Sequence, residues 1–206
     1  MLTRRNLIQG GAAAGLATCL SAPALANQVW ATARPLQPQI NPALLAKAKL
    51  ALDTRPVRNR DMMGVVDFSK ASRDPRFYIV DILSGAATEY HVSHGRGSDP
   101  AHSGWLEYFS NTPSSEASSS GAYLTDNIYY GKYGRSLRLK GLDTTNSNAE
   151  YRNIVVHSAW YAEPEVAEKA GKLGRSEGCF VLSLTNLQYV LLRLGPGRLI
   201  YADKVA

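Results

Sequence analysis

Cysteine is scarce in this sequence, with only Cys19 and Cys179 in a chain of 206 residues. Two cysteines cannot build the disulfide framework of a small secreted scaffold, and Cys19 lies in a segment that we expect to be removed during export. The mature chain then keeps Cys179 as its one thiol, with no partner for an internal disulfide. A lone cysteine in an exported protein is either buried and inert or reactive, so the neighbours of Cys179 must distinguish the two.

Clusters of metal ligands and of basic residues are missing as well. Of the four histidines, His91 and His94 lie close together, but residues three apart on a strand face opposite sides, and further ligands at suitable spacing are lacking. We therefore expect neither a metal nor another cofactor. Basic residues outnumber acidic ones, for a net charge of +6, yet they form no basic stripe, which argues against a nucleic-acid partner.

Long hydrophobic runs are also lacking. The apolar run 10–20 is too short and too rich in Gly and Ala to span a bilayer, so no stable membrane insertion is expected. It follows Arg4-Arg5 and leads to the small-residue site Ala24-Leu25-Ala26, a pattern typical of a secretory signal peptide of the twin-arginine type over residues 1–26. We predict export to the periplasm or cell envelope.

Lipoprotein anchoring at Cys19 is the alternative to this cleavage, because Leu16-Ala17-Thr18-Cys19 is similar to a lipid-attachment box. Thr18 is a poor residue immediately before such a cysteine, and Ala24-Leu25-Ala26 offers the better site. Cleavage after Ala26 removes two arginines and no acidic residue, which lowers the net charge from +6 to +4. This modest positive charge suits work near a polyanionic envelope.

The remaining chain is long enough for one domain and shows no internal repeat. Residues 27–41 are rich in Ala, Gln and Pro without periodicity and are predicted to form a flexible arm. Asn41-Pro42 then provides a cap and a first-turn proline ahead of apolar residues at helical spacing, so a helix is expected over roughly 42–53. The predicted catalytic domain covers 42–206.

Runs of β-branched and aromatic residues predict a fold that is mainly β with a few short helices. The predicted strands are 65–68, 76–82, 88–92, 123–125, 128–130, 136–139, 154–156 and 198–201. Further helices are expected at 164–169 and around 187–194, the second ending at Gly195-Pro196. The serine-rich segment 110–120 is expected to be a polar loop that contributes nothing to a core.

His157 and Cys179 are candidates for nucleophilic catalysis. His157 ends an apolar run and precedes Cys179 by 22 residues, enough for the chain to loop over and bring imidazole and thiol within hydrogen-bond reach. The imidazole can then take the thiol proton, and Gly178 lets a substrate carbonyl approach backbone N–H groups. From these residues alone, the alternative is a buried cysteine and a core histidine.

Longer motifs surround this pair. They are Val156-His157-Ser158-Ala159 with Tyr161, Gly174-Arg175-Ser176-x-Gly178-Cys179, and, upstream, 66–70, 92–98, 109–111 and 130–137. Over most of residues 64–203 the chain resembles the L,D-transpeptidase catalytic-domain family (YkuD-like), in particular its murein L,D-transpeptidase subgroup. The resemblance implies a domain built as a β-sandwich or mixed sheet.

The resemblance also implies roles for individual residues. Cys179 is implied as the nucleophile and His157 as the general base, with Ser158 at the position whose backbone carbonyl orients the imidazole. Gly178 and Cys179 are implied as donors of oxyanion N–H groups.

The implied substrate contacts are Arg175, Ser176, Tyr161 and His94. For Arg175 an ordinary ion pair is the alternative, for Ser176 a role within the turn, and for His94 a role in fixing its loop. The chain departs from the broader family at Glu177, where a histidine is common, and we expect this change to affect loop packing more than mechanism.

The implied activity is that of a peptidoglycan L,D-transpeptidase, which forms a cysteine thioester with a stem tetrapeptide and passes it to an amine acceptor. Donor and acceptor stem peptides are then the expected partners, and a monomer is the expected state. One alternative is an L,D-carboxypeptidase or other hydrolase with the same Cys-His site. The other is a non-catalytic cell-wall-binding module.

Overall fold

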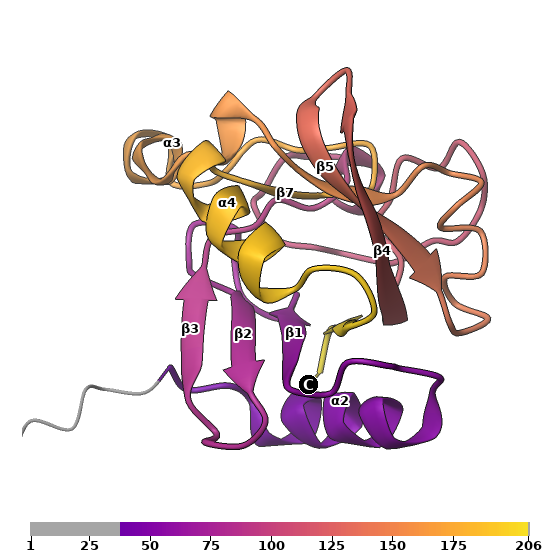
Figure 1. The fold of residues 1–206 in the computed structure, drawn as a ribbon. Coiled ribbons are helices and arrows are strands. Elements are labelled where there is room, and N and C mark those ends of the chain that lie inside the picture. Colours follow the sequence, from indigo (N-terminus) through magenta and orange to yellow (C-terminus); the bar gives the residue numbers. More distant parts are fainter. Residues whose placement is uncertain (1–37, 206) are drawn as a thin grey trace, which may run out of the picture. The chain divides into compact units, whose positions relative to one another are not determined.

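Eight strands form one mixed sheet in the computed structural model, which describes residues 38–205 (Figure 1). The predicted signal peptide and most of the predicted arm lie outside these residues. Along the sheet the strands follow the order β3 (Ala87–Tyr90), β2 (Phe77–Asp81), β1 (Met62–Asp67), β8 (Leu199–Asp203), β4 (Gly121–Gly131), β5 (Gly134–Gly141), β6 (Val155–Ser158) and β7 (Phe180–Leu182). The helices are α2 (Pro42–Thr54), α3 (Pro164–Ala170) and α4 (Leu184–Arg193), with short 3-10 turns η1 (Arg96–Ser98) and η2 (Trp160–Ala162).

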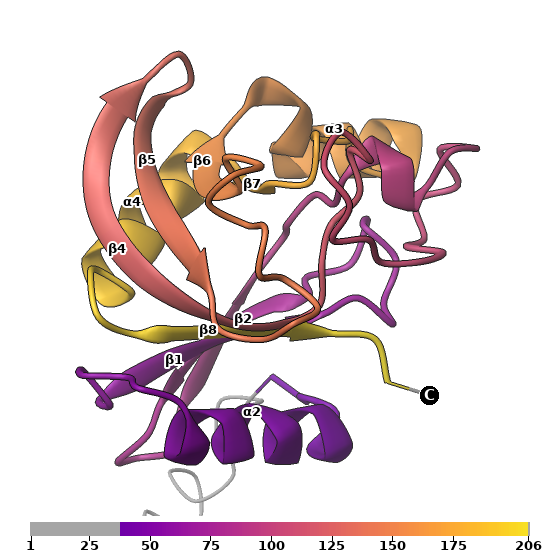
Figure 2. The same cartoon turned by 90° about the vertical axis from the view of Figure 1, so that its right-hand side faces the viewer.

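The prediction of a mainly β fold with a mixed sheet is confirmed. Strands β1 and β8 pair in parallel, as do β6 and β7, and the other neighbours are antiparallel. A register shift between Thr125 and Ile128 interrupts the β4–β5 ladder, and such bulges bend and twist a strand pair. Figure 2 shows the result, because β4 and β5 curve strongly away from the rest of the sheet.

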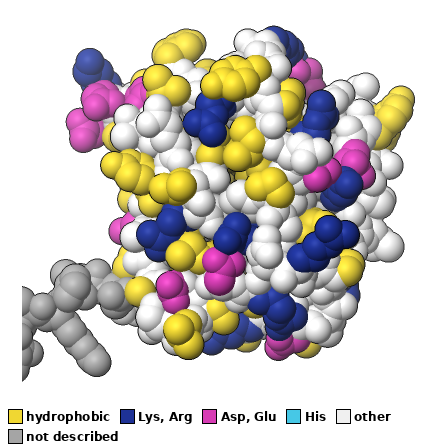
Figure 3. Space-filling view, in the orientation of Figure 1, with side chains coloured by type: hydrophobic (Ala, Val, Ile, Leu, Met, Phe, Trp, Pro, Cys, Tyr) yellow, Lys and Arg dark blue, Asp and Glu magenta, His cyan; other side chains and the backbone are white. Residues whose placement is uncertain are grey.

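Of three hydrophobic clusters in residues 38–205, the two larger ones lie on opposite faces of the sheet. The larger of these two packs α4, through Leu187, Val190 and Leu191, against side chains from both ends of the curved sheet, among them Phe77 on β2 and Phe180 on β7. The smaller one packs α2 against β1, β2 and β8. Figure 2 shows α2 and α4 on either side of β1 and β8. The outer side of α4 carries exposed Leu184 and Leu192, and the face drawn in Figure 3 mixes such hydrophobic side chains with charged ones.

The starts of α2 and α4 are set by local side-chain caps. The Asn41 side chain accepts a hydrogen bond from the Ala43 N–H at 2.9 Å, so α2 begins at Pro42 as expected. Helix α4 begins at Leu184, three residues before the predicted start, because the Ser183 hydroxyl accepts from the Asn186 N–H at 3.1 Å. A side-chain cap of this kind satisfies a first-turn N–H group. Within residues 38–205, no helix has the length and apolar character that crossing a membrane requires.

Candidate active site

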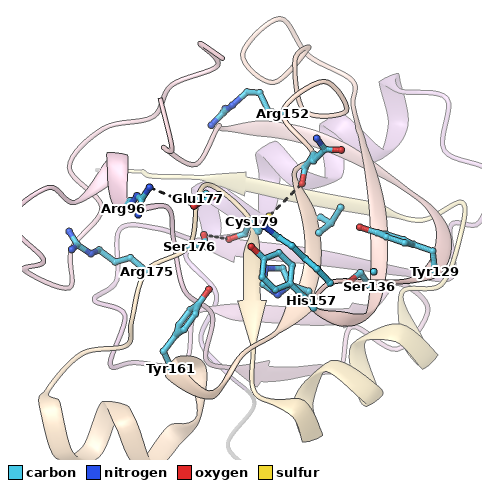
Figure 4. Close-up of a pocket in the computed structure, with 15 residues that line it drawn as sticks. Arg96, Tyr129, Ser136, Arg152, His157, Tyr161, Arg175, Ser176, Glu177 and Cys179 are labelled. Atoms are coloured by element: carbon cyan, nitrogen blue, oxygen red, sulfur yellow. Dashed lines mark hydrogen bonds and ion pairs between the residues drawn. The ribbon is translucent and has the colours of Figure 1, made fainter. Parts of the chain in front are cut away.

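The parallel pairing of β6 with β7 places His157 and Cys179 on the same face of the sheet. His157 pairs with Val181 and Val156 with Phe180. Cys179 precedes Val181 by two residues, and residues two apart in extended chain point to the same side. Both side chains line one pocket of about 510 Å³, shown in Figure 4. The fold therefore brings together the two residues that the sequence singled out.

His157 is held as a neutral, oriented imidazole. Its Nδ1 lies 3.1 Å from the carbonyl oxygen of Ser158, and because a carbonyl only accepts, Nδ1 carries the proton and Nε2 keeps its lone pair. The Tyr133 ring stacks on the imidazole with centroids 4.2 Å apart and planes at 12°. Burial lowers the pKa of His157, with a further lowering by the Lys132 charge that the Ser158 carbonyl opposes. Such an imidazole is free to accept a proton at neutral pH.

Cys179 is a protonated thiol at rest. Its side chain is buried, with 8% exposed, and Sγ donates a hydrogen bond to the Asn153 carbonyl at 3.6 Å. Burial raises the pKa of Cys179 to about 11, and Glu177 raises it further, while the Val155 N–H and two cations lower it. The thiol must leave the Asn153 carbonyl to give its proton to the imidazole, because no hydrogen bond joins the two side chains in the described structure.

The turn before Cys179 is held from within by Ser176. Its Oγ accepts from the Gly178 N–H at 3.1 Å and donates to the Cys179 carbonyl at 2.8 Å. Gly178 itself has φ +112, a conformation that favours glycine. The structure thus differs from the expectation that both Gly178 and Cys179 offer free oxyanion donors, because the Gly178 N–H already has an acceptor. The Cys179 N–H has none within residues 38–205.

Arg175, Ser176 and Tyr161 line the pocket with the pair. The Arg175 guanidinium donates through Nη1 to the carbonyls of Asp99 and Pro100, the latter at 3.1 Å. Arg175 was expected either to contact substrate or to form an ordinary ion pair. In the structure, backbone carbonyls rather than a carboxylate hold its guanidinium at the rim of the pocket. Burial raises the pKa of Tyr161 to about 12, so its hydroxyl remains a hydrogen-bond donor over the whole neutral range.

His94 does not reach the pocket, which corrects its assignment as a substrate contact. Its side chain is 1% exposed, with Nδ1 2.8 Å from Nη2 of Arg76 and Nε2 3.2 Å from the Asp99 carboxylate. Burial, together with the Arg76 charge, lowers the pKa of His94 to about 3. Its backbone is the connection to the site, because the His94 carbonyl accepts from the Ser176 N–H at 2.9 Å. His94 fixes its loop, as in the alternative interpretation.

The serine-rich segment 110–120 is part of the folded body, so the prediction that it contributes nothing to a core was wrong. Ala117, Ser118 and Ser119 are all buried. The Ser118 hydroxyl accepts from the Gly95 N–H at 3.0 Å and donates to the Gly178 carbonyl at 3.4 Å. Hydroxyl side chains are compatible with burial when each finds a partner. The segment packs against the Cys179 turn and, through Ser118, links it to the loop at Gly95.

Several pocket residues escaped the sequence analysis. Arg152 and Asn153 precede β6 in a turn and carry no motif, although both lie beside Cys179. Lys132 and Tyr133 form the two-residue loop between β4 and β5, since Gly131 pairs with Gly134. This loop lies within the motif 130–137, but the motif assigned no role to its residues, and its place over His157 had no local signal.

The charges around the pocket are mainly positive. Arg96, Lys132, Arg152 and Arg175 line it, against one carboxylate, Glu177. Arg96 pairs with Glu116 and lies 3.6 Å from Glu177. An anionic peptide fits such a surface better than a cationic one. Within residues 38–205, no group of His, Cys, Asp and Glu could hold a metal ion.

A family model described as the L,D-transpeptidase catalytic domain matches residues 36–202. No curated protein matches the sequence. Among solved structures, an L,D-transpeptidase from Mycobacterium smegmatis is similar, with 15% identity, a TM-score of 0.43, and coverage of 69% of this chain and 58% of that one.

Two further solved structures have a similar sequence identity to this chain. For an L,D-transpeptidase from Mycobacterium tuberculosis H37Rv, identity is 14%, the TM-score is 0.42, and 70% of this chain and 58% of that one are covered. For residues 123–326 of an L,D-transpeptidase from Xylanimonas cellulosilytica, identity is 13%, the TM-score is 0.39, and 75% of this chain and 68% of that one are covered. The chain spans less than two thirds of the length of the two mycobacterial structures.

Proposed function

The chain belongs to the family of L,D-transpeptidase catalytic domains, and on this premise we propose that it cross-links peptidoglycan through a thioester on Cys179. The observation that carries the proposal is the shared pocket of His157, on β6, and Cys179, directly before the adjacent parallel strand β7, with the Ser158 carbonyl orienting the imidazole. A nucleophile, a base and a group that orients the base are the parts that covalent acyl transfer requires.

The first half of the reaction forms the thioester. The thiol proton of Cys179 passes to Nε2 of His157 while Sγ attacks the carbonyl carbon at the L-centre of the third residue of a stem tetrapeptide. The developing oxyanion accepts a hydrogen bond from the Cys179 N–H. Collapse breaks the C–N bond, and the leaving D-alanine amine takes the proton from His157, which returns the imidazole to its neutral form.

The second half transfers the acyl group. An amine of a second stem peptide attacks the thioester carbonyl and gives a proton to His157, and the C–S bond breaks. The sulfur then regains this proton, so the pair ends as it began. Since His157 is neutral at rest and has a lowered pKa, it is available as base at the start of each half.

The positive pocket supports a carboxylate-bearing donor. A stem tetrapeptide carries free carboxylates next to the scissile bond, and Lys132 and Arg175 lie on the pocket wall. Charged hydrogen bonds of this kind orient a peptide as well as attract it. Tyr161 completes the proposed substrate contacts, whereas the Ser176 hydroxyl is already engaged within the Cys179 turn.

A hydrolase that uses the same Cys-His site is the second candidate, in which water resolves the thioester and trims the peptide. The buried thiol and the Tyr133 ring over His157 favour the transferase, because an enclosed site limits access of water to the thioester. A non-catalytic cell-wall-binding module predicts instead that Cys179 stays unmodified by any donor. Export by the twin-arginine-type signal peptide, which supplies access to peptidoglycan, belongs to the same proposal.

Intact-mass measurement after incubation with defined muropeptides tests the proposal. We expect a mass increase equal to the acyl donor on the wild type and none on Cys179→Ser, together with cross-linked dimers in the product mixture. His157→Gln controls for the base and should slow adduct formation while leaving the fold intact. Trimmed monomers without dimers would support the hydrolase, and a wild type that forms neither adduct nor product would reject both enzymes.

A further inference from the structure

Arg152 lies against the Cys179 turn and takes no part in the steps above. Its Nη1 donates to the Ser110 carbonyl at 2.7 Å, and its Nη2 donates to the Ala117 carbonyl. A Cβ on Gly178 would stand 3.1 Å from Nη2 of Arg152, so the guanidinium lies next to the residue that precedes the thiol. Figure 4 shows Arg152 on the wall of the pocket that contains Cys179. Two backbone carbonyls therefore fix a positive charge beside the sulfur.

The position of this charge differs from that of the other nearby cation, Lys132. Burial is the main influence on the pKa of Cys179 and raises it, and both Arg152 and Lys132 oppose this rise. Burial also lowers the pKa of His157, and there the cation that adds to the lowering is Lys132. Lys132 thus favours the thiolate but disfavours the imidazolium that forms with it. Arg152 favours the thiolate alone.

The other charged and titratable groups of the pocket come from neighbouring elements. They are Arg175 and Glu177 in the Cys179 turn, Arg96 in η1, Tyr129 on β4, Tyr133 in the β4–β5 loop, His157 on β6 and Tyr161 in η2. Glu177 is the one carboxylate among them and opposes negative charge on the sulfur. The fixed cation Arg152, beside the same turn, offsets this repulsion.

We propose that Arg152 is a positioning residue of the site, whose guanidinium stabilises negative charge on Cys179 as the thiol proton moves to His157 and ties the serine-rich segment to the Cys179 turn. The inference rests on the proposed function, because it concerns the same proton transfer. The charge separation is balanced: one proton leaves sulfur for Nε2, and the electron pair stays on sulfur beside the guanidinium.

The rate of Cys179 alkylation by iodoacetamide, followed by intact mass from pH 6 to pH 9, tests this role without any peptide. This range lies on the rising limb of the pH profile, below the midpoint set by the Cys179 pKa of about 11, and the displacement of the limb along the pH axis gives the shift of the midpoint. In Arg152→Gln we expect the midpoint of the pH profile to rise by about one unit, which slows labelling roughly tenfold at a fixed pH below the midpoint. Glu177→Gln removes the opposing charge and should shift the midpoint downward. Arg60→Gln is the matched control, because Arg60 also bonds a backbone carbonyl, that of Leu52, but lies outside this pocket.

Arg152→Lys covers the case in which Arg152→Gln does not fold, because it keeps the charge and loses the two-carbonyl fork. Its midpoint should stay within about half a unit of the wild type. An unchanged midpoint in folded Arg152→Gln, or a rise of a full unit in Arg152→Lys, would overturn the inference. If the variants show these shifts but the wild type forms no thioester, the proposed function is refuted and the effect of the Arg152 charge on the thiol still stands. A wild type that turns over peptide while Arg152→Gln is unaffected would refute the inference alone.

Discussion

Removing the Ser176 hydroxyl is the sharpest single test of how the Cys179 turn is held. The side chain is 5% exposed, and its Oγ serves both the Gly178 N–H and the Cys179 carbonyl. In Ser176→Ala the two backbone groups lose their buried partner. A net hydrogen bond contributes about 1 kcal/mol, and a buried group left unsatisfied costs about 1 to 3 kcal/mol. We expect the free energy of unfolding to fall by roughly 2 to 3 kcal/mol.

Urea unfolding monitored by fluorescence measures this change. With a slope of about 2 kcal/mol per molar urea, the midpoint should move down by about 1 M at an unchanged slope. Ser84→Ala is the matched control, because the Ser84 hydroxyl also accepts a backbone N–H in a turn, that of Ala86 at 3.2 Å, but is exposed. Its effect should stay within about 0.5 kcal/mol. A Ser176→Ala variant as stable as Ser84→Ala would refute the view that these two hydrogen bonds hold the turn.

Three further perturbations address the core, the His94 cluster and the Tyr133 ring. Phe180→Ala empties a buried site and should cost about 3 to 5 kcal/mol of unfolding free energy in the same urea assay; a loss below 1 kcal/mol would contradict its place in the core. Because burial lowers the pKa of His94 to about 3, the unfolded chain binds more protons between about pH 6.5 and pH 3, so stability falls as the pH drops through this window. His94→Gln should flatten that fall, measured by urea midpoints at pH 7 and pH 5, and an equally steep fall in the variant would contradict the assignment. Tyr133→Ala uncovers the His157 imidazole and should raise the pKa of His157 in an NMR titration, whereas an unchanged value would mean that the ring does not shield it.

Local patterns were sufficient to predict most elements of the fold. Asn41-Pro42 predicts the start of α2, and the β-branched runs predict strands close to where they occur. The sequence gives no local signal for the place of β8, which inserts between β1 and β4 and pairs in parallel with the first strand. Such non-local pairing depends on which faces of the whole chain need burial, so it is decided by the assembled core.

The candidate site divides in the same way. His157 and Cys179 were predicted because each lies in a local motif beside an apolar run, and these runs form β6 and β7. Arg152 was missed, since its place beside the thiol depends on carbonyls of a segment some 40 residues upstream. His94 shows the opposite error: its motif resembles one near the site, but its side chain is buried against Arg76, which directly precedes β2.

The in-register ladder between β6 and β7 has a consequence for how this domain tolerates changes in length. The connection between His157 and Cys179 contains α3 and loops at the surface, where added residues cost little, since closure entropy grows slowly with loop length. Deleting one residue between Cys179 and Val181 instead turns the sulfur to the far side of the sheet, because alternate residues face opposite ways. Insertions near α3 should therefore spare the thiol chemistry, while a single deletion at the start of β7 abolishes it.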